Sequence, residues 1–118
     1  MSLRDIEARR KGRAARLRAS LHSTVRQLGA LGALKVILFG SLAAGETDTT
    51  SDVDLLVIMP NTRTSKEWRR TVYERVAPEV ATDLLVFCEE DWERELPVSS
   101  LLRHITSHGR VVYEKTLP

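Results

Sequence analysis

The chain has 118 residues, of which 42% are hydrophobic and 29% charged, and it carries a formal net charge of +2. This composition is that of an ordinary globular protein, and the length predicts one domain, residues 1–118, with a modest core. The apolar stretch at residues 36–39, like every other in the chain, is far shorter than the roughly 20 residues that span a bilayer, and no signal-peptide-like segment follows the N-terminus. Because Cys88 is the only cysteine, we expect no internal disulfide, no cysteine-based metal site, and a cytoplasmic protein without membrane contact.

The N-terminal region is basic, whereas the rest of the chain is acidic. Residues 1–28 hold eight lysine or arginine residues and two acidic ones, and the remainder holds ten basic and fourteen acidic residues. Within residues 4–28 the apolar side chains recur at spacings of three and four, which predicts an amphipathic helix. We therefore expect a basic helix in residues 1–30 that ends near Gly29 or Gly32. Its arginines could meet nucleic acid or an acidic partner, but a solvated face is the favoured interpretation, and nucleic acid is not an expected partner.

Short strands and helices alternate through the rest of the chain. Strands are predicted over residues 35–39, 53–59, 82–87 and 110–113. Helices are predicted from Thr64 or Ser65 to near Pro78, over residues 89–95 and over residues 99–107. This order indicates an α/β or α+β protein with a small sheet of mixed strand directions.

Three aspartates stand at the beginnings of two of these predicted strands. Asp52 and Asp54 are two residues apart, so on a strand their side chains point to the same face, about 6.6 Å apart. Asp83 opens the next apolar run and would join them if the two strands are neighbours. Neighbouring carboxylates repel each other unless a cation lies between them, and Mg²⁺ suits such oxygen ligands. The alternative is that these aspartates are charged residues that protect strand ends from aggregation.

A glycine–serine turn directly follows the first predicted strand. Gly40 allows close approach of the backbone, and the N–H groups of such a turn, together with the hydroxyl of Ser41, can hold phosphate oxygens. Phosphate and Mg²⁺ belong together chemically, because the metal neutralises the charge that the turn gathers. The turn therefore favours a nucleotide site over simple protection of strand ends.

Gly40-Ser41, ten intervening residues and then Asp52-Val53-Asp54 resemble the signature of the DNA polymerase β-type nucleotidyltransferase superfamily. The resemblance is closest to its minimal nucleotidyltransferase (MNT) branch, small proteins often encoded beside HEPN-domain partners. It covers residues 36–87, and residues 109–113 also look like the end of such a domain. The resemblance implies a mixed sheet with helices packed on one side.

The resemblance also implies a mechanism and a partner. Asp52 and Asp54 would carry two Mg²⁺ ions, Asp83 would complete the metal site and help activate the attacking hydroxyl, and Gly40 with Ser41 would seat the triphosphate. A nucleoside monophosphate, AMP from ATP being the expected case, would pass from an NTP to a hydroxyl of a HEPN-like helical protein, which the chain would restrain as an antitoxin does. The catalytic core would span residues 35–87, followed by helices and a strand in residues 88–118.

One position departs from the family pattern, and two other functions are alternatives to nucleotidyl transfer to a partner protein. Ala44 stands where members of this branch frequently carry an arginine, which puts robust activity in doubt. The first alternative is a non-catalytic module that neutralises a partner through the basic helix and an apolar face. The second is transfer to a small molecule of the aminoglycoside type. The sequence leaves homo-oligomerisation open.

Four further features carry less weight. Residues 40–47 nearly match a phosphate-binding P-loop, but Glu46 stands where that motif needs a lysine, so we reject it. His104 and His108 are four apart on a predicted helix, and without a third ligand we expect a surface role. Trp68 and Trp92 fit core or interface positions, although Trp92 stays a candidate wall for a base. Cys88 is expected to pack in the core.

Overall fold

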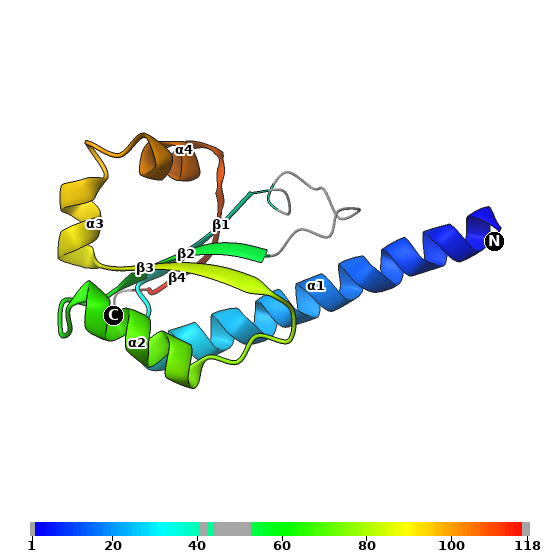
Figure 1. Ribbon diagram of the computed structural model, residues 1–118, viewed down its shortest axis with the longest axis horizontal. Coiled ribbons are helices and arrows are strands. Elements are labelled where there is room, and N and C mark those ends of the chain that lie inside the picture. Colours follow the sequence, from blue (N-terminus) through cyan, green and yellow to red (C-terminus); the bar gives the residue numbers. More distant parts are fainter. Residues whose placement is uncertain (1, 41–42, 44–52, 117–118) are drawn as a thin grey trace.

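The computed structural model describes residues 2–40, 43 and 53–116. Four helices and four strands follow one another in these parts of the chain, as Figure 1 shows. The helices are α1 (Leu3–Leu31), α2 (Ser65–Arg75), α3 (Glu89–Glu95) and α4 (Ser100–His108). The strands are β1 (Lys35–Phe39), β2 (Val53–Met59), β3 (Thr82–Cys88) and β4 (Arg110–Glu114).

The strands form one mixed sheet in the order β3-β2-β1-β4. β1 pairs with β2 and with β4 in antiparallel fashion, whereas β2 and β3 are parallel. Parallel neighbours need a crossover connection, and α2 provides it between β2 and β3. The predicted α+β class with a mixed sheet is thereby confirmed.

Helices cover both faces of this sheet, which corrects the expectation that they pack on one side. The longer helices α1 and α2 pack on one face, where Leu28, Trp68 and Val72 meet the odd-numbered residues of β2. The short helix α4 packs on the other face, where Leu102 and Ile105 lie in one cluster with Leu56. Figure 1 shows α3 and α4 across the sheet from α1 and α2. The reason is that β2 is apolar on both faces, and a strand of that kind needs cover on both.

Helix α1 runs to the second of the two glycines at which its end was expected. It starts at a capping box in which the side chains of Ser2 and Asp5 each bind the other's backbone N–H. It passes through Gly29, where the ring of Tyr113 packs so close that a Cβ atom would lie 3.2 Å from it. It ends at Gly32, whose φ of 108° is the left-handed conformation that glycine adopts easily. Although α1 has 29 residues, no helix in the described parts of the chain is apolar enough to span a membrane.

The two halves of α1 have different surroundings. Its buried residues begin only at Leu17 and continue with Ser20, Thr24 and Leu28. The preceding turns extend beyond the sheet on the side where β1 ends and β2 begins (Figure 1). This projection accounts for the elongated shape, with principal extents of 53 × 29 × 28 Å.

Candidate functional site

Asp54 and Asp83 are direct neighbours across the parallel pair of strands β2 and β3. The register of the two strands sets Asp54 opposite Asp83. Parallel strands lie about 4.8 Å apart, and residues directly opposite each other project from the same face of the sheet. The structure therefore brings two of the three predicted carboxylates together.

The alternation of side chains along β2 and β3 decides which face these carboxylates occupy. Val53 and Leu55 are buried in the core beneath α1 and α2, so Asp54 between them projects from the opposite face. Leu84 packs against the same core as Val53, and its neighbour Asp83 likewise projects from the other face. Asp83 is exposed and Asp54 is half-buried. A bound ion or substrate can thus reach this pair from solvent.

Gly40 follows β1 and lies against the carboxylate of Asp54. The last residue of β1, Phe39, pairs with Asp54 in the antiparallel register. Gly40 has a φ of 78°, in the left-handed region, and a Cβ atom placed on it would overlap Asp54 Oδ2. Only glycine allows this close approach without strain. The predicted phosphate turn therefore begins in contact with Asp54, one carboxylate of the pair.

Ser41 and Asp52, two of the predicted site residues, lie outside the described residues. Ala44, where the family pattern often has arginine, also lies outside them. Their roles, like those assigned to Gly40, Asp54 and Asp83, stay predictions. Within residues 2–40, 43 and 53–116, no group of three or more histidine, cysteine, aspartate or glutamate residues could hold a metal ion.

The chemistry of the two described carboxylates suits a hard divalent cation. Two adjacent carboxylates repel each other when both are ionised, and a cation between them removes that repulsion. Mg²⁺ takes oxygen ligands, commonly one or two carboxylates, and keeps several waters or phosphate oxygens besides. Asp54 and Asp83 fit this requirement in type, in orientation and in exposure.

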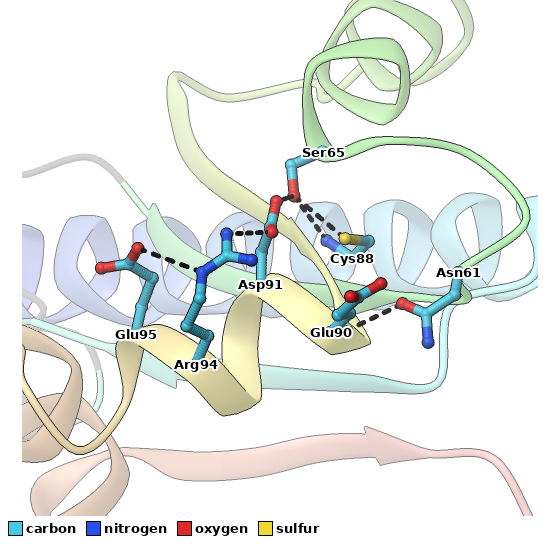
Figure 2. Close-up of polar contacts among 7 residues, drawn as sticks. All are labelled: Asn61, Ser65, Cys88, Glu90, Asp91, Arg94 and Glu95. Carbon is cyan, nitrogen blue, oxygen red and sulfur yellow. Dashed lines mark hydrogen bonds and ion pairs between the residues drawn. The ribbon is translucent and has the colours of Figure 1, made fainter.

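A second polar cluster lies at the opposite end of β3 and has a structural role. The buried Ser65 donates a hydrogen bond of 2.5 Å to Asp91 Oδ2 and accepts one of 2.9 Å from the backbone N–H of Cys88 (Figure 2). Arg94 donates to the other oxygen of Asp91. The Ser65 hydroxyl is the largest cause that holds the pKa of Asp91 below its ordinary value, against the opposing effect of burial and with help from Arg94. These bonds join α2, β3 and α3.

The start of α3 depends on the same junction. Cys88 precedes this helix and provides no side-chain cap, but the side-chain oxygen of Asn61 accepts from the backbone N–H of Glu90 at 2.8 Å (Figure 2). Glu89, Glu90 and Asp91 in the first turn also interact favourably with the helix dipole. This junction could not be predicted from the sequence, because it joins segments more than twenty residues apart.

The cysteine, the two tryptophans and the two neighbouring histidines lie outside the carboxylate pair. Cys88 and Trp68 are buried in the core, as expected. The rings of His104 and His108 stack at 4.3 Å on the outside of α4. The rings of Trp92 and Phe87 lie 6.5 Å apart, and Phe87 is four residues from Asp83, about 13 Å along β3. The role of Trp92 as a wall for a base stays a prediction.

Comparison with known proteins gives one match. A family model described as a nucleotidyltransferase domain matches residues 20–111, a region that includes Gly40, Asp54 and Asp83. No curated protein and no solved structure matches the chain significantly.

Proposed function

The chain belongs to the nucleotidyltransferase domain family, and we propose that it transfers a nucleoside monophosphate, AMP from ATP in the first instance, to a hydroxyl of a partner protein. The observation that carries the proposal is the register of β2 and β3, which sets Asp54 beside Asp83 on one face of the sheet. Gly40, in contact with Asp54, supports a nucleotide site at the same place.

Asp54 and Asp83 would hold Mg²⁺, and Asp52 joins them in the proposal on its spacing alone. When bound, Mg²⁺ neutralises the charge of the triphosphate and stabilises the charge that develops during displacement. The backbone at Gly40 and the hydroxyl of Ser41 would orient the phosphates. Asp83, the more exposed of the two described carboxylates, would accept the proton of the attacking hydroxyl. The hydroxyl oxygen then bonds to the α-phosphorus, and the bond to the departing pyrophosphate breaks.

We propose a helical protein of the HEPN type as the acceptor, restrained by the chain as a toxin is by its antitoxin. The support is the spacing from Gly40-Ser41 to Asp52 and Asp54, which resembles that of the MNT branch. On this proposal the accepting hydroxyl belongs to a side chain of the partner. The transferred nucleotide would then change the activity of the partner.

Label transfer tests the proposal directly. The purified protein is mixed with Mg²⁺, each of the four labelled NTPs in turn, and a purified helical protein of the HEPN type. We expect label on the partner with at least one NTP, and a loss of about 100-fold or more in rate when Asp54 or Asp83 is changed to Asn, since removal of one transition-state contact costs on that order. Glu90→Gln, an exposed carboxylate on α3, is the matched control and should keep the full rate.

The same variants separate the proposal from a non-catalytic binding module. If Asp54→Asn and Asp83→Asn still neutralise the partner fully while label transfer is absent for the wild type, the chain acts by binding alone. Label on an added aminoglycoside, with none on any protein, would instead indicate a small-molecule acceptor. Either result would refute the proposed protein acceptor.

A further inference from the structure

The first turns of α1 form a surface outside the described carboxylate pair Asp54 and Asp83. We call residues 3–16 the basic arm. None of these residues is buried, and α1 first enters the core at Leu17. Figure 1 shows the arm extending away from the sheet. The arm also lies outside residues 20–111, the region that the family model matches.

The basic arm offers positive charge and an apolar tip. Arg4, Lys11 and Arg16 are exposed, and no ion pair connects any of the three with another described residue. Leu3, at the tip, is 79% exposed. A helix of this length is about 21 Å long. Such a surface suits a partner that combines negative charge with an apolar recess.

A cavity with these properties lies beside α3. It has a volume of about 290 Å³ and opens between α3 and the ends of β1, β2 and β4. Leu34, Ile58 and Trp92 supply its apolar surface, and Glu89 and Glu93 line it from α3. We call this the acidic cavity. An aromatic ring next to carboxylates attracts cationic side chains, because the face of the ring and the carboxylates are both negative.

The charge around the acidic cavity is negative on the side of α3. Lys35, Lys115 and Glu114 line the opposite side, but the seven residues of α3 hold five acidic side chains and one arginine. Glu89 and Glu93 make no ion pair with any other described residue. Both carboxylates can therefore receive a cation from another molecule.

The basic arm and the acidic cavity lie at opposite ends of the molecule. The cavity is formed where β1 begins and β2 ends, whereas the arm projects beyond the other end of these strands (Figure 1). The long axis measures 53 Å, so the two surfaces do not meet within one chain. We propose that the basic arm of one copy docks on the acidic cavity of a second copy, with Leu3 against Trp92 and with Arg4 and Lys11 beside Glu89 and Glu93.

This contact is head-to-tail, which has two consequences. The arm of the second copy stays available, so association continues beyond a dimer unless the copies close into a ring. The contact is also largely between exposed charges, so salt weakens it: the Debye length falls from about 10 Å at 0.1 M to about 3 Å at 1 M salt.

Sedimentation velocity on the full chain tests the proposal. At about 20 mM salt we expect the weight-average mass to rise with protein concentration beyond that of a dimer, and at about 1 M salt to fall to that of the monomer, as screening predicts. Arg4→Glu with Lys11→Glu should weaken association at least tenfold, and so should Glu89→Lys with Glu93→Lys. An equimolar mixture of these two double variants should associate again, because the reversed charges at positions 4 and 11 of one variant then face reversed charges of opposite sign at positions 89 and 93 of the other.

Two further double variants control for net charge. Lys66→Glu with Arg75→Glu changes the charge as the arm variant does, and Glu74→Lys with Glu79→Lys changes it as the cavity variant does. All four residues are exposed and lie on α2 or just after it, and both variants should associate like the wild type. Circular dichroism confirms that each protein is folded before its mass is measured.

Three outcomes would overturn the proposal. The first is a wild type that stays monomeric at low salt at every concentration. The second is a folded mixture of arm and cavity variants that does not associate. The third is a monomeric wild type that binds a labelled single-stranded RNA with steep salt dependence, since the arm would then have a nucleic-acid partner instead.

Discussion

Gly40 and the carboxylate of Asp54 approach each other so closely that no other residue type fits at position 40. A Cβ atom there would overlap Asp54 Oδ2, and the φ of 78° is one that residues with a side chain rarely adopt. At the candidate site, the end of β1 therefore supplies a backbone without a side chain, and the start of β2 supplies the carboxylate that packs against it.

Replacement of Gly40 by Ala should disable the candidate site with a modest loss of stability. The left-handed backbone costs about 1–2 kcal/mol for alanine, and the new methyl group displaces the Asp54 carboxylate. We expect label transfer to fall at least as far as in Asp54→Asn. Gly12→Ala is the control, because a Cβ atom there meets only the Arg16 side chain at 3.9 Å. A Gly40→Ala protein that keeps the full transfer rate would show that the position of Asp54 does not matter.

Mg²⁺ should stabilise the folded protein through the carboxylate pair. A ligand that binds only the folded state raises the free energy of unfolding by about 2.7 kcal/mol at 100 times its dissociation constant. Thermal unfolding with and without Mg²⁺ should show a higher midpoint with the ion for the wild type, and no shift for Asp83→Asn. Without Mg²⁺, Asp83→Asn should be as stable as the wild type or more stable, because the repulsion from Asp54 is reduced.

Glu90→Gln should respond to Mg²⁺ as the wild type does, since its side chain lies at the other end of β3. Equal midpoint shifts in Asp83→Asn and the wild type would place the ion elsewhere.

The neighbouring positions of Asp54 and Asp83 could be predicted in part from the sequence. Both residues open apolar runs, and alternation along a strand settles the face of each once the strands are known to be adjacent. The contact between Gly40 and Asp54 could not be predicted, because it depends on how closely β1 and β2 approach, which spacing does not encode. The cover on both faces of the sheet was missed because β2 is apolar at every position except Asp54, and such a strand shows little periodicity that separates its faces.

Ser65→Ala should destabilise the protein, and more at neutral pH than in acid. The change removes the donor to Asp91 and leaves the backbone N–H of Cys88 without its acceptor, at a cost of about 1–3 kcal/mol for a buried group. The folded-state pKa of Asp91 lies below its ordinary value, mainly because of Ser65. This contribution to stability is complete above the unfolded pKa of about 3.9 and is lost as the pH falls through the lower folded value.

Urea unfolding at pH 7 and near pH 3 measures this difference. The loss in free energy of unfolding for Ser65→Ala relative to the wild type should be smaller at the lower pH. Ser107→Ala, at an exposed position on α4, should show no such change. A loss for Ser65→Ala that is equal at both pH values would exclude Asp91 as the partner that matters.

Thr64→Ala should also destabilise the protein less in acid than at neutral pH, in this case through the carboxyl group of Glu67. The side chain of Thr64 and then its backbone lower the pKa of Glu67, whose carboxylate accepts from both in the capping box of α2. Protonation of Glu67 in acid removes this interaction in the wild type. The difference in free energy of unfolding between the wild type and Thr64→Ala should therefore become smaller as the pH falls below about 4.3. The capping box was predictable from sequence at Thr64 because it is local, whereas the bond from Ser65 to Asp91 spans 26 residues.

Two buried hydroxyls one turn apart on α1 should respond in opposite ways to removal. Ser20 Oγ accepts from the backbone N–H of Val80 at 3.3 Å, whereas Thr24 Oγ1 is buried without a hydrogen-bond partner in the described parts of the chain. Thr24→Val replaces an unsatisfied hydroxyl by a methyl group of similar size, so we expect the free energy of unfolding to rise by about 1 kcal/mol. Ser20→Ala leaves the Val80 N–H unsatisfied and should lower the free energy of unfolding by about 1–3 kcal/mol. Chemical denaturation of both variants decides the matter: a Thr24→Val protein destabilised as much as Ser20→Ala would mean that Thr24 has a partner after all.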